Sequence, residues 1–263
     1  MAQEIKRWLA AWLGAGIIAA HTGAWIGPAM AQSGQAQSGQ AQSGPAQSGE
    51  EELGPVFLLS LGGKLYDDLW TVTELVPPEG ANTAFPANPD VSDRDTWRCV
   101  SCHGWDYKGS AGERGAAVPG LKSPGLTALA GVDPERIIER IRAPSHPFPA
   151  DQLPELAGEL LAAFLSAGQR KRSDFTGGDP EAGKGIFEGA CTNCHQIDGR
   201  RYLRGEPGDR SSLGWVVRNR PDQSLHKILN GVPAAEMLSL HFMPDWQIAD
   251  LLAYVSTLDQ PAR

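Results

Sequence analysis

Cysteine and methionine are scarce in this sequence of 263 residues, and both shortages narrow what it can do. All four cysteines lie inside two C-x-x-C-H motifs, so none remains for a separate structural disulfide or a thiolate nucleophile. Of the four methionines, only two lie beyond Met30. A basic excess is also missing: the net charge is −8, which argues against nucleic acid as a partner because a phosphate backbone requires a basic face.

The sequence also lacks runs of alternating apolar and polar residues that are long enough for a β-strand, so we predict an all-α fold with long loops.

The N-terminus has the pattern of an export signal: Lys6 and Arg7, then an apolar stretch over residues 8–20, then small residues at 29–31. We therefore predict a cleaved signal peptide over residues 1–31. An uncleaved membrane anchor stays open, because residues 8–30 nearly provide the about 20 apolar residues that cross a bilayer.

Composition divides the remaining chain into segments. Residues 32–52 are a low-complexity tract of Gln, Ser, Gly and Ala without an apolar face, so we predict a flexible, disordered linker. A polar stretch at 169–178 predicts a second linker between two domains, 53–168 and 179–263, each long enough to bury its own core.

The same plan occurs in both domains. A C-x-x-C-H motif is followed by a Gly- and Pro-rich stretch, by a short helix that begins at Pro134 or Pro221, and by a closing amphipathic helix. Apolar residues at three- and four-residue steps predict the buried faces of the closing helices. These residues are Leu153, Leu156, Leu160 and Phe164 in the first domain and Ile248, Leu251, Leu252, Val255 and Leu258 in the second.

The two motifs carry the chemistry. They consist of Cys99, Cys102 and His103 in the first domain and Cys191, Cys194 and His195 in the second. This spacing is the attachment signature of a c-type heme: both cysteines form thioethers with the porphyrin, and the histidine faces the iron as proximal ligand. A lone C-x-x-C could be a redox disulfide or half of a zinc site. The histidine in both copies, and the 92 residues that separate the two pairs, favour two covalently bound heme c groups.

With Gly183, Phe187, the second motif and Tyr254, residues 179–263 resemble the class I cytochrome c family. Residues 53–168 resemble a subgroup of bacterial diheme cytochromes, with an unusually long stretch between Tyr66 and Trp97. The resemblance implies two tandem cytochrome c-like domains, in which the first and last helices cross beside each heme.

The distal iron ligand decides the chemistry, because an iron with two protein ligands shuttles electrons whereas an open iron can bind substrate. Class I cytochromes usually supply a methionine, and Met237 and Met243 are both in the second domain. Met237 lies 42 residues after His195, and His146 lies 43 residues after His103. We therefore predict His103/His146 for the first heme and His195/Met237 for the second. Met243 stays open as the alternative to Met237, and an exposed loop position stays open for His146.

Further side chains have predicted supporting roles. We expect large aromatic residues to pack around the porphyrins, two arginines are candidate partners of the heme propionates, and two histidines are expected to pack or to lie at the surface. The aromatic residues are Trp97, Trp105, Tyr107 and Trp215. The two arginines are Arg98 and Arg218, and the two histidines are His226 and His241.

Methionine ligation raises a heme potential above that of bis-histidine ligation, so we predict transfer from the first heme to the second. The resemblance implies a periplasmic diheme electron carrier, which an uncleaved N-terminal segment would tether to the membrane. Its expected partners are redox proteins: a dehydrogenase or quinol-oxidising complex as donor and an oxidase or another cytochrome as acceptor. The alternatives are a catalytic diheme cytochrome, a cytochrome subunit of a dehydrogenase such as one for sulfur compounds, and a structural subunit of a respiratory or photosynthetic complex.

Overall fold

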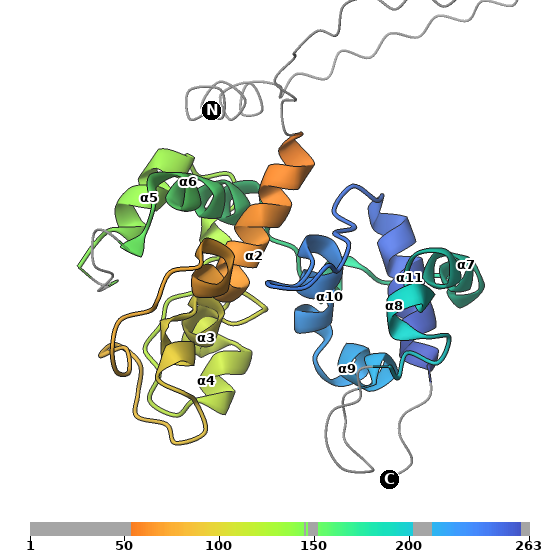
Figure 1. The fold of residues 1–263 in the computed structure, drawn as a ribbon, viewed down its shortest axis with the longest axis horizontal. Coiled ribbons are helices and arrows are strands. Elements are labelled where there is room, and N and C mark those ends of the chain that lie inside the picture. The colour runs from red at the N-terminus through yellow and green to blue at the C-terminus, as the bar shows by residue number, and fades with distance from the viewer. Residues whose placement is uncertain (1–53, 145, 147–151, 202–211, 259–263) are drawn as a thin grey trace, which may run out of the picture. The chain divides into compact units, whose positions relative to one another are not determined.

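The computed structural model describes residues 54–144, 146, 152–201 and 212–258. These residues form helices joined by loops and contain no strand, which confirms the predicted helical class (Figure 1). None of the helices in these ranges is both long and apolar enough to cross a membrane. The predicted signal peptide or anchor (1–31) and the predicted linker (32–52) lie outside the described residues.

The helices fall into two groups along the chain. The first group is α2 (Pro55–Thr73), α3 (Cys99–His103), α4 (Glu113–Ala117), α5 (Pro134–Ile141) and α6 (Glu155–Ala163), which continues as a π-helical turn, η5 (Phe164–Gly168). The second group is α7 (Pro180–Ala190), α8 (Thr192–His195), α9 (Leu213–Asn219), α10 (Pro221–Asn230) and α11 (Asp245–Thr257). Short 3₁₀ turns lie in the segments between these helices. They are η1 (Arg94–Trp97), η2 (Gly109–Ala111), η3 (Thr127–Leu129) and η6 (Arg172–Asp174).

Proline and aspartate start several of these helices. Pro134, Pro180 and Pro221 are the first residues of α5, α7 and α10, where the missing N–H of proline costs no hydrogen bond. Asp133 and Asp179 cap α5 and α7, and each carboxylate accepts a hydrogen bond from a backbone N–H of the first turn. The helices predicted at Pro134 and Pro221 are thus confirmed.

The two groups of helices have separate hydrophobic cores, one drawn from residues 65–165 and one from residues 175–258. All the predicted core residues of the closing helices are buried except Leu156, which is 43% exposed. The prediction for Leu156 is wrong because it counted helical steps from Leu153, whereas α6 begins only at Glu155. The buried face of this helix instead contains Ala157 and Leu161 beside the predicted Leu160 and Phe164.

In each half the first and last helices pack against each other at a glycine. A Cβ on Gly183 of α7 would lie 2.0 Å from the carbonyl oxygen of Asp250 in α11. A Cβ on Gly62 of α2 would lie 2.2 Å from the carbonyl oxygen of Leu160 in α6. Only a residue without a side chain permits these approaches, so glycine sets how closely the two helices of each pair can pack.

An aromatic pair follows each glycine contact by one helical turn. The rings of Phe187 and Tyr254 are centred 5.5 Å apart in the second half. Those of Tyr66 and Phe164 are centred 5.8 Å apart in the first. Such tilted pairs add to the packing energy of their buried area. The two halves therefore repeat the same local packing, although their connecting segments differ.

The long connection between α2 and α3 is held against α2 by arginines. Arg94 donates hydrogen bonds of 2.8 and 3.1 Å to the two carboxylate oxygens of Asp68. The indole N–H of Trp97 donates to the carbonyl of Gly80 at 2.8 Å. A small apolar cluster of Phe85, Val118 and Leu121 supports this segment. These contacts bring the chain back to α2 just before the first C-x-x-C-H motif.

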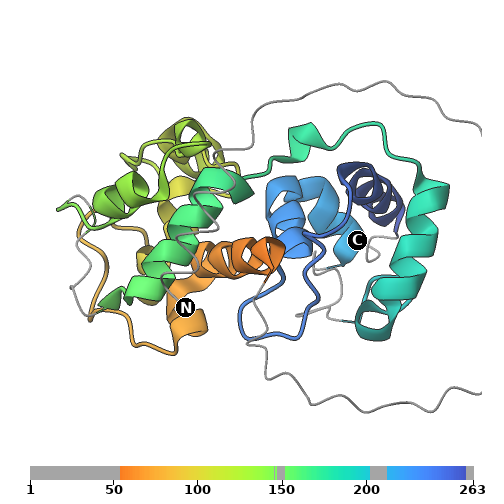
Figure 2. The same cartoon turned by 90° about the horizontal axis from the view of Figure 1, so that it is seen from above.

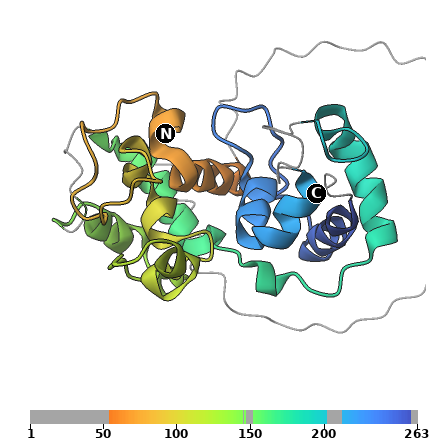
Figure 3. The same cartoon turned by 90° about the horizontal axis from the view of Figure 1, so that it is seen from below.

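The two halves meet where α10 packs on α2 (Figures 2 and 3). A hydrogen bond of 2.6 Å joins the hydroxyls of Ser60 and Ser239 at this contact. Asn230 lies so near Gly63 that a Cβ on the glycine would be 2.3 Å from its side chain. The described residues from Gly54 onward belong to one compact unit, so this contact is an internal one.

Candidate functional sites

The first C-x-x-C-H motif is itself a helix, α3, so its two cysteines and its histidine project from a single turn. His103 is buried, and its Nδ1 lies 2.9 Å from the carbonyl oxygen of Pro124 and 3.0 Å from the hydroxyl of Ser123. Burial lowers the pKa of His103 to about 4, so the ring is neutral. Because a carbonyl only accepts, Nδ1 carries the proton and Nε2 carries the lone pair that a metal ion requires.

His146 follows α5 and has a matching arrangement. Its Nδ1 lies 3.0 Å from the carbonyl oxygen of Arg140 in the last turn of that helix. This carbonyl also requires the proton on Nδ1, so the neutral form of the ring carries its lone pair on Nε2. A hydrogen bond from Nδ1 to a carbonyl is the usual device that fixes the orientation of a metal-binding imidazole. Both predicted ligands of the first heme thus have the tautomer that binds a metal through Nε2.

The distance between the two rings fits a shared iron. Their centres are 6.1 Å apart and their planes are inclined by 37°. A bond from imidazole to a first-row metal ion is about 2.0–2.1 Å long, and the ring centre lies about 1.2 Å behind its nitrogen. Two imidazoles on opposite sides of one ion therefore have centres about 6.4 Å apart. His103 and His146 lie close to that separation although 43 residues separate them in the sequence.

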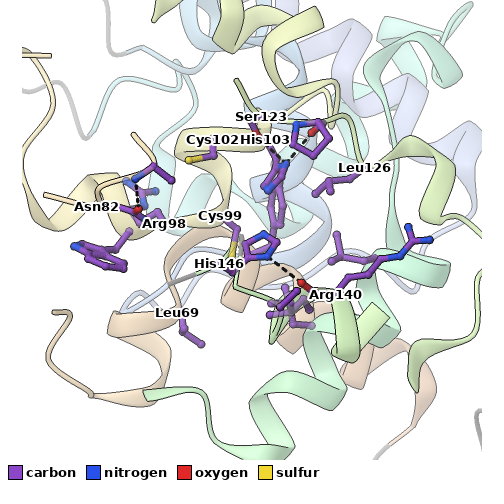
Figure 4. Close-up of a pocket in the computed structure, with 18 of the residues that line it drawn as sticks. Leu69, Asn82, Arg98, Cys99, Cys102, His103, Ser123, Leu126, Arg140 and His146 are labelled. Carbon is purple, nitrogen blue, oxygen red and sulfur yellow. Dashed lines mark hydrogen bonds between the residues drawn. The ribbon is translucent and has the colours of Figure 1, made fainter. Parts of the chain in front are cut away.

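Both histidines line a cavity of about 400 Å³ (Figure 4). Its walls are mainly apolar, and its volume is within the range of roughly 300–1,000 Å³ of small-molecule pockets. Three lining residues are cationic, Arg98, Lys122 and Arg140, and none of the described lining residues is acidic. An apolar, flat ligand that carries carboxylates matches this lining, and a heme with its two propionates is such a ligand.

Cys99 and Cys102 line the same cavity as the two histidines. Burial, and then the neighbouring Cys102, raise the pKa of Cys99 to about 12, and burial raises the pKa of Cys102 to about 11. A redox dithiol needs a lowered thiol pKa, because the thiolate is the nucleophile. The pair is therefore poorly suited to thiol–disulfide exchange, while both cysteines line the cavity.

The second motif also forms a short helix, α8, preceded by Cys191. Cys191 is half-buried against the second core, whereas Cys194 is exposed. Burial, and then Cys194, raise the pKa of Cys191 to about 11, and burial lowers the pKa of His195. The chain between Tyr202 and Ser211, which follows this motif, lies outside the described residues. The described part of this site is thus α8 with Cys191, Cys194 and His195.

Met237 and Met243 both lie in the loop between α10 and α11. Both are half-buried, but only Met243 is among the side chains that pack against the second core, as Cys191 also does. This packing is an observation in favour of Met243, the residue that the internal repeat ranked second. Met237 as the distal ligand of the second heme stays a prediction.

The predicted aromatic and arginine roles divide in the structure. Trp97 and Arg98 line the cavity, whereas Trp105 and Tyr107 pack against His226 of α10. Arg218 donates hydrogen bonds to backbone carbonyls at the end of α11. Trp105 and Tyr107 are not among the described residues that line the first cavity, and their packing around a porphyrin stays a prediction. His226, which was expected to pack or to lie at the surface, is buried, with 2% of its surface exposed.

Sequence reasoning missed the residues that orient the ligands. Ser123 and Pro124 face His103 from a loop 20 and 21 residues further along the chain. Their only sequence signal is membership of the Gly- and Pro-rich stretch after the motif. The chain then turns sharply after each motif histidine: Gly104 has φ 76° and ψ 165°, and Gln196 has φ 62° and ψ 168°.

Comparisons with protein-family models, with curated proteins and with solved structures each found no match. Within the described ranges, no group of three or more His, Cys, Asp or Glu side chains is placed to hold a metal ion by itself.

Proposed function

We propose that the chain is a diheme c-type cytochrome of two tandem class I-like domains, which transfers electrons between redox proteins in the periplasm. The first heme would be attached to Cys99 and Cys102 with His103 and His146 as axial ligands. The second would be attached to Cys191 and Cys194 with His195 and Met237. The proposal depends chiefly on one observation: the facing rings of His103 and His146 in a cavity that both cysteines of the motif line.

A bound heme supplies reversible one-electron chemistry at an iron with two protein ligands. The protein would contribute three things at the first site. The carbonyls of Pro124 and Arg140 hold the two imidazoles in the coordinating tautomer. The apolar walls exclude water, and the cationic lining residues would pair with the propionates.

The helix packing supports two domains of the same kind. Each half crosses its first and last helices at a glycine with an aromatic pair one turn away, as the resemblance to class I cytochromes implies. Imidazole at both axial positions gives a lower potential than imidazole with thioether sulfur. Transfer would therefore proceed from the first domain to the second.

The decisive test is His146→Ala in protein from a host that attaches c-type hemes. We expect two covalently added hemes by mass in wild type and variant alike, and two low-spin irons by electron paramagnetic resonance in the wild type. In the variant, the first heme should become high-spin and should bind added cyanide or imidazole, because one axial position is open.

The matched control is His241→Ala. His241 is half-buried and lies 3.2 Å from the side-chain oxygen of Asn230, away from the cavity-lining residues. This variant should keep both irons low-spin. A colourless wild type would refute the cytochrome proposal itself. If His146→Ala keeps a low-spin first heme of unchanged potential, then His146 is not the ligand. Ligand binding to the wild-type protein would instead favour the catalytic alternative.

A further inference from the structure

The α10 helix is buried on two sides, and its two sides serve different halves of the protein. Leu225 and Leu229 belong to the second core. His226 points the other way: its Nε2 donates to the carbonyl of Gly63 at 2.9 Å, and its Nδ1 lies 3.2 Å from the hydroxyl of Tyr107. A helix of the second half thus supplies side chains to the interior of the first.

Lys227, the next residue of α10, places a cation beside the first motif. Its ammonium pairs with the carboxylate of Asp67 on α2, whose side chain is only 1% exposed. The other carboxylate oxygen of Asp67 accepts a hydrogen bond of 2.6 Å from Arg98. Arg98 directly precedes Cys99 and lines the cavity of the first site. One buried carboxylate therefore joins an arginine at the cavity to a lysine of the other half.

The same ammonium also contacts an aromatic residue of the motif region. It lies 5.2 Å from the ring centre of Trp105, within the distance of a cation–π interaction. Trp105 is two residues beyond His103, and its ring is centred 4.9 Å from that of His226. Lys227 is thus fixed between α2 and the segment that directly follows the proximal histidine.

Both cations of this group are partly buried. Lys227 and Arg98 are 21% and 24% exposed and share the single buried carboxylate of Asp67. Arg98 also lies 3.2 Å from Asp95, but that carboxylate is 40% exposed and is screened by solvent. Lys227 thus brings one partly buried positive charge to α2, next to the arginine that lines the first site. At an effective dielectric constant of about 20, a unit charge on the order of 10 Å away shifts a redox equilibrium by roughly tenfold.

We propose that Lys227, a residue of the second half, sets the redox potential of the first heme site. This inference rests on the proposed cytochrome function. A positive charge opposes the gain of positive charge that accompanies oxidation, so Lys227 favours the reduced form of the first heme. The group of Lys227, Asp67 and Arg98 makes that potential depend on the docking of α10 against α2.

The test is Lys227→Gln, which removes the charge but can still donate a hydrogen bond to Asp67, with Lys227→Arg as the variant that keeps the charge. In a redox titration of the whole protein, Lys227→Gln should lower the reduced-to-oxidised ratio of the first heme about threefold or more at a fixed potential. Lys227→Arg should restore the wild-type ratio. Lys184→Gln, on α7 and paired only at 3.9 Å with Glu188 on the surface, should leave it unchanged.

A second variant reverses the sign. Asp67→Asn leaves two cations without their carboxylate, so the reduced-to-oxidised ratio of the first heme should rise. Heme content is measured by mass and absorbance on every variant. This measurement separates the proposed cytochrome function from the proposed role of Lys227. Absence of heme from the wild type refutes the proposed function. Two hemes with an unchanged first potential in Lys227→Gln, or equal shifts in Lys227→Gln and Lys227→Arg, overturn the role of Lys227.

Discussion

Replacing Gly183 by alanine tests the contact between α7 and α11. The added Cβ would lie 2.0 Å from the carbonyl oxygen of Asp250, whereas ordinary contacts begin at 3.4 Å. The two helices must therefore move apart by about 1.4 Å, and overpacking of this kind costs about 1–3 kcal/mol, occasionally more. Alanine recovers about 1 kcal/mol of helix propensity. We expect a net loss of up to about 2 kcal/mol in the free energy of unfolding.

Gly185, two residues further along α7, is the matched control. Nothing lies within 4 Å of the position that its Cβ would occupy, and the residue is exposed. Gly185→Ala should therefore gain about 0.5–1 kcal/mol from the reduced freedom of the unfolded chain and from helix propensity.

Urea unfolding followed by circular dichroism at 222 nm measures both variants. The expected result is a midpoint that moves down for Gly183→Ala and up for Gly185→Ala. Equal shifts in the same direction would show that α7 does not approach α11 at Gly183, and would remove one of the two glycine contacts that support the tandem arrangement.

Two other perturbations give further tests. Burial lowers the pKa of His226 to about 4, because its effect is larger than that of Asp67, which raises this pKa. His226 in the unfolded chain therefore takes up a proton near pH 6.5, whereas His226 in the folded chain does not. The contribution of His226 to stability should therefore fall by at most about 1.4 kcal/mol per unit as the pH falls from about 6.5 towards 4. In urea unfolding, the loss of stability between pH 7 and pH 5 should be smaller in His226→Gln than in the wild type. Gln196→Gly should raise the free energy of unfolding by about 1 kcal/mol in the same assay, because the backbone angles of Gln196, φ 62° and ψ 168°, suit glycine. Gly104→Ala should lower the free energy of unfolding for the same reason. No gain in Gln196→Gly would mean that the turn is unstrained.

The sequence allowed prediction of those features that depend on local spacing. The prolines that begin α5 and α10 and the periodicity of α11 identified these helices. The nearly equal spacing in the two halves, 43 and 42 residues, pointed to His146 as the residue that lies near His103. Leu156 was misplaced because periodicity alone does not mark where a helix begins.

Features that depend on distant contacts could not be read from the sequence. The carbonyl of Pro124 approaches His103 only through the path of a loop, and the packing of Trp105 on His226 joins residues 121 positions apart. No periodicity encodes either contact. The sharing of α10 between two cores was hidden for the same reason, since its amphipathic pattern predicts only one buried face.

The position of α10 also affects how the protein is made. As the chain leaves the ribosome, Asp67 emerges 160 residues before the lysine that completes its ion pair. Until then, the buried carboxylate and the carbonyl of Gly63 lack partners that the finished protein provides. A fragment cut within residues 169–178 would remain in that incomplete state, so the N-terminal half should mature only after nearly the whole polypeptide has been synthesised.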